Sequence, residues 1–200
     1  MSPSASVALA LAVAAGVSPY ATVALLGLTN RLGWVPVLPD HLAGVASPWV
    51  ITLAVVLTAI EFAATLVPGI ASAWEAVHAA IRPFLGAALA LLVVWGGDPA
   101  LTLAIGLAGG TLAFGTTLTK LGARLAIDTS PEPVSNGVAN VTELGFVAAL
   151  SVLVWRHPVL TLVVAVAIVA TTAMLVRAVW GLIWKTVSRA RRPGKAGIRS

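Results

Sequence analysis

Six stretches of almost uninterrupted apolar residues constrain this chain more than any other feature. A hydrocarbon core of about 30 Å needs roughly 20 apolar residues in a helix. The stretches cover residues 7–28, 48–67, 84–95, 100–118, 138–155 and 158–184. With 59% apolar and only 10% charged residues, the chain has too little polar surface to cover a soluble domain. We therefore expect an all-α, polytopic transmembrane helical bundle with about six spans.

The third stretch is the shortest, because the apolar run ends before a turn at residues 96–99. Two arrangements in the membrane are compatible with this short stretch. It is either a thin span extended backward through Ala79 or a re-entrant hairpin with the fourth stretch. In the extended span, Arg82 would reach the membrane interface and Pro83 would lie in the first helical turn.

The first stretch is interrupted by Ser18-Pro19, and residues 6–15 resemble the apolar core of a signal peptide. No Lys or Arg precedes Arg31, so the basic segment that usually opens a signal peptide is missing. A retained first span, broken near its middle, is the better interpretation.

Basic residues concentrate at the C-terminal end. Half of the twelve lie in the last sixteen positions: Lys185, Arg189, Arg191, Arg192, Lys195 and Arg199. The positive-inside rule predicts an inner-membrane protein whose tail, residues 186–200, is cytoplasmic. Six crossings then place the N-terminus on the cytoplasmic side too, with nine of the eleven Lys and Arg residues outside the apolar stretches on that side. No base-reading motif accompanies the tail, so we expect no nucleic-acid partner.

A spacing pattern relates the two halves of the chain. It consists of Gly16, Ser18 and Arg31 in the first half and Gly109, Thr111 and Arg124 in the second. With six crossings the two copies run in opposite directions, which predicts inverted three-span repeats at residues 1–97 and 98–185. Broken helices at residues 16–20 and 109–115 would line a cavity. The alternatives are a chance match and glycines that serve only close helix packing.

Each half carries one glutamate inside an apolar stretch, Glu61 and Glu143. An acid at mid-span costs about 2.5 to 3.5 kcal/mol on insertion, so it usually faces a cavity, pairs with a base or stays protonated. Arg31 or Arg82 is an available partner for Glu61. Lys120 or Arg124 is available for Glu143. The pattern fits proton or cation coupling and equally fits static ion pairs that lock helices together.

Two polar segments are unlike ordinary connections. Residues 128–136 are rich in oxygen ligands, and Asn136 and Asn140 continue toward Glu143, where a cation or a polar headgroup would find ligands. A helix N-cap at Asn136 is the simpler explanation for part of this segment.

The second polar segment has helical spacing. Its members are Trp74, Glu75, His78 and Arg82. This spacing predicts an amphipathic helix at the membrane interface, with the tryptophan as an anchor. Glu-x-x-His is also half of a metal site, but no second copy accompanies it, and we predict no metal and no cofactor.

Several of these strings together resemble an uncharacterised bacterial membrane family, domain of unknown function 4126, over residues 8–175. The matching positions are residues 16–31, Glu61-Phe62, residues 67–69, 72–78 and 81–83, Lys120, Arg124, residues 129–133, Ser135-Asn136 and Glu143. The family pattern has an Asp-Lys pair before the proline aligned with Pro68, where this chain has Thr65-Leu66. The resemblance implies a multi-span membrane protein and supplies no established reaction.

We predict a small transporter or lipid translocase and not an enzyme, because no nucleophile–base set is recognisable. The expected substrate or coupling residues are Ser18, Arg31, Glu61, Thr111, Lys120, Arg124, Asn136, Asn140 and Glu143. The substrate is an anionic lipid or a small ion; arginines and half-helix N-termini suit the first, glutamates the second. The alternative is a membrane scaffold or assembly factor whose basic tail binds a partner or anionic lipid. A homodimer is plausible, since six short spans are few to enclose a pathway.

Overall fold

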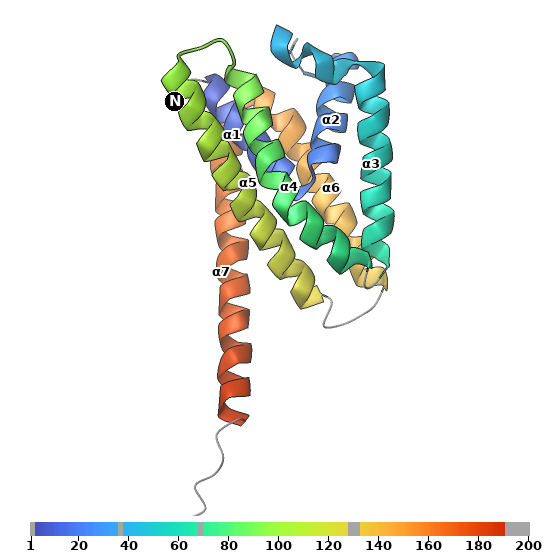
Figure 1. The fold of residues 1–200 in the computed structure, drawn as a ribbon, viewed down its shortest axis with the longest axis vertical. Coiled ribbons are helices and arrows are strands. Elements are labelled where there is room, and N and C mark those ends of the chain that lie inside the picture. The colour runs from blue at the N-terminus through green and yellow to red at the C-terminus, as the bar shows by residue number, and fades with distance from the viewer. Residues whose placement is uncertain (1–2, 36–37, 68–69, 128–132, 191–200) are drawn as a thin grey trace, which may run out of the picture.

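The computed structural model describes residues 3–35, 38–67, 70–127 and 133–190. Within these ranges the chain is all-α, with no strand, as expected (Figure 1). The elements are α1 (Pro3–Val17), α2 (Pro19–Arg31), the 3-10 helix η1 (Asp40–Ala46), α3 (Pro48–Leu66), α4 (Ile70–Val94), α5 (Pro99–Ile127), α6 (Pro133–Arg156) and α7 (Pro158–Ala190).

Four helices are long and apolar enough to cross a membrane. The stretches are Pro48–Leu66, Ala73–Val94, Pro99–Arg124 and Asn136–Arg156. Only 17% of the first stretch and 33% of the second are buried inside the protein, so their apolar side chains need lipid to cover them. Exposed Trp34, Trp49 and Trp95 lie near one end of the bundle, as in an interfacial aromatic belt. These features suggest a membrane protein.

The first predicted span is two short helices that meet at Ser18. The Ser18 hydroxyl caps α2 by accepting from the amide of Ala21, and Pro19 occupies the first helical position. With 15 and 13 residues, each helix is about 20 Å long, too short for a crossing.

The two short helices form a V, because the chain turns back at Ser18 (Figure 1). The start of α1 lies with the α4–α5 turn, where Ser4 and Asp98 line one cavity. The end of α2 lies at the start of α3, where Arg31 donates to the carbonyl of Ala46. Both outer ends are therefore at the same end of the bundle. The expectation of one broken crossing is wrong, and the N-terminal end of α1 lies opposite the end of α7.

The third predicted span is longer than the sequence suggested. Helix α4 begins at Ile70 and continues through Pro83 to Val94, so residues 84–95 are the second half of a full-length helix. It packs antiparallel to α5, and the re-entrant hairpin considered for this pair is not formed. A proline inside a helix removes one amide donor but does not end this helix.

Helix α5 is continuous through residues 109–115, where the sequence suggested a break. Thr111 is exposed and its hydroxyl donates to the carbonyl of Leu107 in its own helix. Gly109 serves packing: a Cβ placed there would lie 2.6 Å from the Cβ of Ala90 and 3.3 Å from that of Ala12. The equal spacing of the two halves does not correspond to equal local structure.

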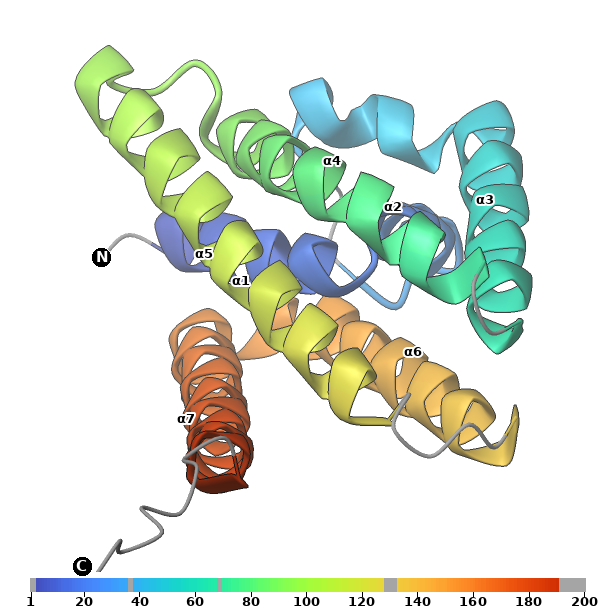
Figure 2. The ribbon, with the colours of Figure 1, turned by 60° about the horizontal axis from the view of Figure 1, so that its bottom comes forward.

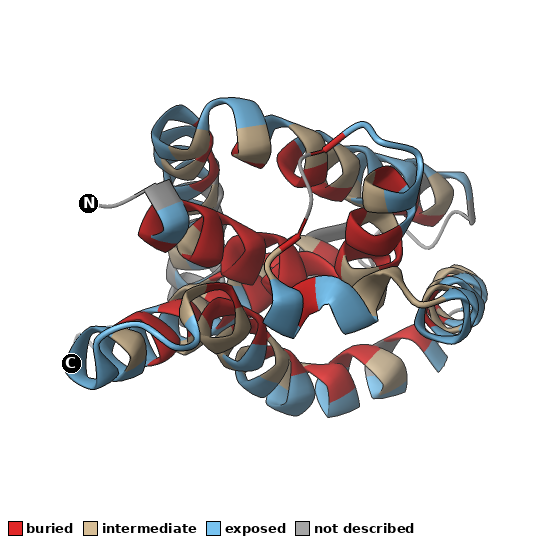
Figure 3. Ribbon diagram, turned by 90° about the horizontal axis from the view of Figure 1, so that it is seen from above, coloured by how far each residue is buried: buried red, intermediate tan, exposed pale blue. Residues whose placement is uncertain are grey.

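Small residues let α1, α4 and α5 approach closely. A Cβ on Gly16 would lie 2.5 Å from the carbonyl oxygen of Ala113, and one on Gly86 would overlap the Cβ of the same alanine. Figure 2 shows α5 crossing over α1 with α4 alongside. Helix α1 is the most buried element, red along most of its length in Figure 3.

Candidate functional site

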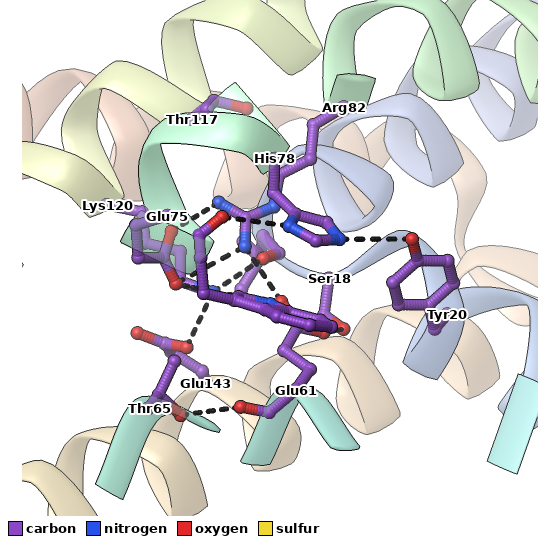
Figure 4. Close-up of polar contacts among 12 residues, drawn as sticks. Ser18, Tyr20, Glu61, Thr65, Glu75, His78, Arg82, Thr117, Lys120 and Glu143 are labelled. Carbon is purple, nitrogen blue, oxygen red and sulfur yellow. Dashed lines mark hydrogen bonds and ion pairs between the residues drawn. The ribbon is translucent and has the colours of Figure 1, made fainter. Parts of the chain in front are cut away.

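Six charged side chains meet between α3, α4, α5 and α6. They are Glu61, Glu75, Arg82, Lys120, Arg124 and Glu143. We call them the ion network, and Figure 4 labels all of them except Arg124. Three are acidic and three basic, so the network is neutral when all are ionised. Charges this far inside a bundle are tolerated only when paired.

Arg82 lies at the centre of the ion network and is fully buried. Its Nη2 is 2.7 Å from Oε1 of Glu61 on α3, and its Nη1 is 2.6 Å from Oε2 of Glu75 on α4. One planar guanidinium thus joins two carboxylates, a geometry that a lysine cannot reproduce. Of the two partners that the sequence predicts for Glu61, Arg31 and Arg82, the structure selects Arg82.

This part of α4 is more buried than its amphipathic spacing predicts. Glu75, His78 and Arg82 are only 2%, 5% and 0% exposed. Because α4 continues through Pro83, the segment forms the first half of a long helix. The face that carries these residues points into the bundle.

Lys120 connects four elements. Its Nζ lies 3.0 Å from Glu143, 3.1 Å from Glu75 and 3.5 Å from Glu61. It also donates to the carbonyl of Val17 at 3.0 Å. That carbonyl lacks a helical partner because α1 ends there, and a cation at a helix C-terminus is favourable. The break at Ser18 therefore supplies a ligand to the site.

Arg124 joins α5 to α6. It contacts Oε1 of Glu143 through Nε at 3.1 Å and Nη2 at 3.0 Å. It also donates to the side-chain carbonyls of Asn136 and Asn140. Asn136, Asn140 and Glu143 share one face of α6 by helical spacing. These amides stabilise the arginine; of the adjacent oxygen-rich segment, residues 128–132 lie outside the described residues.

Two short polar contacts complete the site. The Ser18 hydroxyl donates to Oε2 of Glu61 at 2.5 Å, which ties the turn of the V to α3. Thr65 donates to Oδ1 of Asn140 at 3.1 Å, which ties α3 to α6.

Two predicted site residues lie elsewhere. Arg31 is exposed at the end of α2, where it contacts Ala46 and not Glu61. Thr111 is exposed on α5. Both were chosen from the spacing repeat, which the structure does not reproduce.

Next to the ion network, a neutral contact links α2 to α4. The Nδ1 of His78 lies 2.8 Å from the carbonyl of Trp74 and donates to it; in a neutral imidazole Nε2 then accepts from the hydroxyl of Tyr20, 3.0 Å away. The Trp74 ring stacks on His78 with centroids 4.3 Å apart. Tyr20 is not among the predicted site residues, although it directly follows the Ser18-Pro19 break.

Three cavities lie in or near the ion network, and members of the network line the first and the third of them. A small one of about 30 Å³, enough for a water molecule, is lined by Ser18, Glu61, Lys120, Asn140 and Glu143 among others. A second, of about 400 Å³, lies between α2 and α3 with walls at Ala24, Leu25, Leu28, Val55 and Ala59. A third, of about 350 Å³, is lined by Lys120, Arg124, Ala139, Glu143, Phe146 and Val169 among others. We call the last two the α2–α3 groove and the α5–α6 groove.

The two grooves occupy different halves of the bundle. The α2–α3 groove follows α2 from its middle to its outer end, toward the end where α1 begins. The α5–α6 groove follows the second half of α5 and the first half of α6, toward the opposite end. The small cavity shares Thr58 and Phe62 with one groove and Lys120 and Glu143 with the other. The small cavity thus connects the α2–α3 groove to the ion network, which also lines the α5–α6 groove.

The fold and site define a helical membrane-type protein with a paired ionic centre between two apolar grooves. The family model described as "Domain of unknown function (DUF4126)" matches residues 5–178, and the chain belongs to this family. Neither a search of curated proteins nor a search of solved structures returned a match.

Proposed function

We propose that this protein is a small membrane transporter of the lipid-translocase kind, with the ion network as its substrate or coupling site. One observation carries the proposal. Members of a neutral cluster of six charges line the α5–α6 groove and the small cavity, and the small cavity adjoins the α2–α3 groove in the other half of the bundle.

The physical argument concerns the two parts of an amphiphile. Its polar head needs charged or hydrogen-bonding partners at membrane depth, and its apolar chain can stay in lipid or in a groove. A network with equal positive and negative charge offers partners to a head group without a large net field. The grooves offer chain-sized apolar walls on either side.

In the membrane arrangement that we propose, α3 to α7 cross the bilayer and the V of α1 and α2 is re-entrant. Irregular backbone such as the Ser18 turn is tolerated at depth where protein buries it. The positive-inside rule places the basic tail in the cytoplasm and hence the start of α1 outside. The chain has no cysteine, so Ser4→Cys and Ser200→Cys variants report orientation directly. An impermeant maleimide should label intact cells at position 4 and not at position 200; the reverse would reject this orientation.

A scaffold or assembly factor is the second candidate, and the saturation of the ion network favours it. Arg82, Lys120 and Arg124 each have two or more partners, as in an ionic lock that only holds helices together. A scaffold needs the lock but has no use for the grooves. The two functions therefore differ in what they require of the groove walls.

The deciding experiment fills each groove in turn. Ala139→Phe places a ring in the α5–α6 groove and Ala59→Phe places one in the α2–α3 groove. Ala104→Phe adds the same ring to an exposed position of α5 and is the control. Each protein is reconstituted in liposomes, and the transfer of fluorescent phospholipids between leaflets is measured alongside ion flux.

A translocase should lose most transfer in both groove variants and keep it in the control, with unchanged unfolding midpoints. Transfer that is absent in the wild type, or unaffected by both filled grooves, would reject the proposal in favour of the scaffold.

A further inference from the structure

Glu143 differs from the other members of the ion network in its exposure. Its side chain is 23% exposed, while those of Glu61 and Glu75 are 7% and 3% exposed. It is also the acid that lines the α5–α6 groove. Glu143 can therefore leave the network toward the groove without first opening the bundle.

Two cations depend on Glu143 to different degrees. Lys120 retains Glu61 and Glu75 when Glu143 is removed. Among the described residues, Arg124 retains the neutral amides of Asn136 and Asn140 and no second carboxylate. A buried guanidinium without an anion is costly, so a second anion has a strong reason to bind there.

The geometry of the two cations suits a phosphate. Lys120 and Arg124 are one helical turn apart on α5 and both line the α5–α6 groove. Their residues are 7% and 4% exposed, which keeps them out of competing water. Arginine binds the oxygens of a phosphate through parallel N–H bonds, and lysine adds a point charge.

The contacts of the two cations favour an anion as the substrate. A singly charged phosphodiester can take the place of the Glu143 carboxylate beside Lys120 and Arg124, whereas a cation would lie against two positive charges; the displaced carboxylate stays on α6. The other groove walls include Val17, Ala123 and Phe146, which suit an acyl chain. A volume of about 350 Å³ holds a phosphate and the first part of a chain.

We infer that Glu143 is an exchangeable counter-ion: a lipid phosphodiester enters the α5–α6 groove, displaces this carboxylate and binds Lys120 and Arg124. This assignment rests on the proposed function, because it names the head group that the translocase would carry. No covalent step is involved.

The test is a gain of binding. In a neutral detergent, the affinity of the purified protein for dioleoyl phosphatidylglycerol is measured by native mass spectrometry. Glu143→Gln removes the competing charge and should bind the lipid about tenfold more tightly than wild type. Asp40→Asn, an equal charge change at an exposed residue of η1, should bind like wild type.

Two further probes separate the chemistry. Dioleoylglycerol, which lacks the phosphate, should not bind detectably, and soluble glycerophosphoglycerol should compete poorly because it lacks the chains. Arg124→Lys keeps the positive charge but loses the planar guanidinium that can bind two phosphate oxygens at once. It should weaken phosphatidylglycerol binding severalfold while the protein stays folded. This variant keeps the proposal testable if Glu143→Gln does not fold.

Equal affinity in wild type and folded Glu143→Gln would overturn the inference, as would equal binding of dioleoylglycerol. Equal binding of the soluble head group would reject the lipid and leave a site for a free anion. Tighter binding without leaflet transfer would support the head-group site and reject the translocase. If the filled grooves block leaflet transfer but Glu143→Gln does not bind the lipid more tightly, the translocase would be supported and the head-group site at Glu143 rejected.

Discussion

Helices α4 and α5 are joined in two places by opposite means. Toward the α4–α5 turn they pack through small residues, where Gly109 meets Ala90 and Gly86 meets Ala113. Toward their other ends they are joined by charges, where Lys120 meets Glu75 at 3.1 Å. The first contact excludes everything between the helices, and the second leaves cavities on both sides of it.

The difference between the two contacts separates a rigid part of the bundle from a part that cavities reach. Lipid tails are as apolar as the helices, so close packing of small residues supplies attraction that burial alone does not. Ion pairs hold helices at a greater distance and can exchange partners. The packed region is suited to a fixed frame, and the ionic region to a site that opens.

The largest effect should come from Arg82→Met, which leaves Glu61 and Glu75 without their shared cation. Breaking a buried pair by removing one partner typically costs 3 to 5 kcal/mol, so we expect about 4 kcal/mol in the free energy of unfolding. Reversible SDS unfolding followed by tryptophan fluorescence measures it. Arg156→Gln, at an exposed arginine, is the control. A loss below about 1 kcal/mol would show that the charges are not ionised together.

The packed region is tested by two glycines of the same helix. Gly109→Ala would place a Cβ 2.6 Å from that of Ala90, so α4 and α5 must separate. We expect a loss of about 1 to 3 kcal/mol, as in overpacked cores.

Gly115→Ala is the matched control, because its Cβ would have no neighbour within 4 Å. Alanine there should be neutral or stabilise α5 by up to about 1 kcal/mol through its higher helix propensity. Equal losses in both variants, by SDS unfolding, would mean that helix propensity and not close packing governs α5.

The sequence predicted those features of the packed and ionic regions that depend on local composition. Apolar length located α3 and α6, and the cost of a buried acid led to the pairing of Glu61 with Arg31 or Arg82 and of Glu143 with Lys120 or Arg124; the structure selects Arg82 for Glu61. These pairings follow from one physical rule, that a charge at membrane depth must be paired. The structure adds that all six charges form one network.

The path of the chain after a break, and the face to which a side chain points, could not be predicted from local composition. Ser18-Pro19 marks a break, but a break allows the chain either to continue or to turn back, and contacts of α2 with α3 decide it. Glu75 and His78 have the spacing of an interfacial helix, and only the continuation of α4 through Pro83 buries them. Equal spacing to Arg31 and Arg124 implied equal roles, although one is exposed and the other buried.

The smallest effect should come from Tyr20→Phe, at a contact that belongs to neither region. The Tyr20 hydroxyl donates to Nε2 of His78, so the substitution removes one neutral hydrogen bond between α2 and α4. Such bonds in membrane proteins average about 0.6 kcal/mol and reach about 1.7. We expect a loss near the lower figure in SDS unfolding, since the ring remains to pack edge-on against His78.

The size of this loss tests where the ion network ends. His78 bonds Tyr20 and the Trp74 carbonyl, and both are neutral groups. If the contact only fastens the V to α4, Tyr20→Phe should lower stability slightly and leave phosphatidylglycerol affinity unchanged. A loss above about 2 kcal/mol would exceed what a neutral bond contributes here. Such a loss would mean that the Tyr20–His78 hydrogen bond is coupled energetically to the ion pair of Glu61 and Arg82. Helix α2 would then belong to the ionic region.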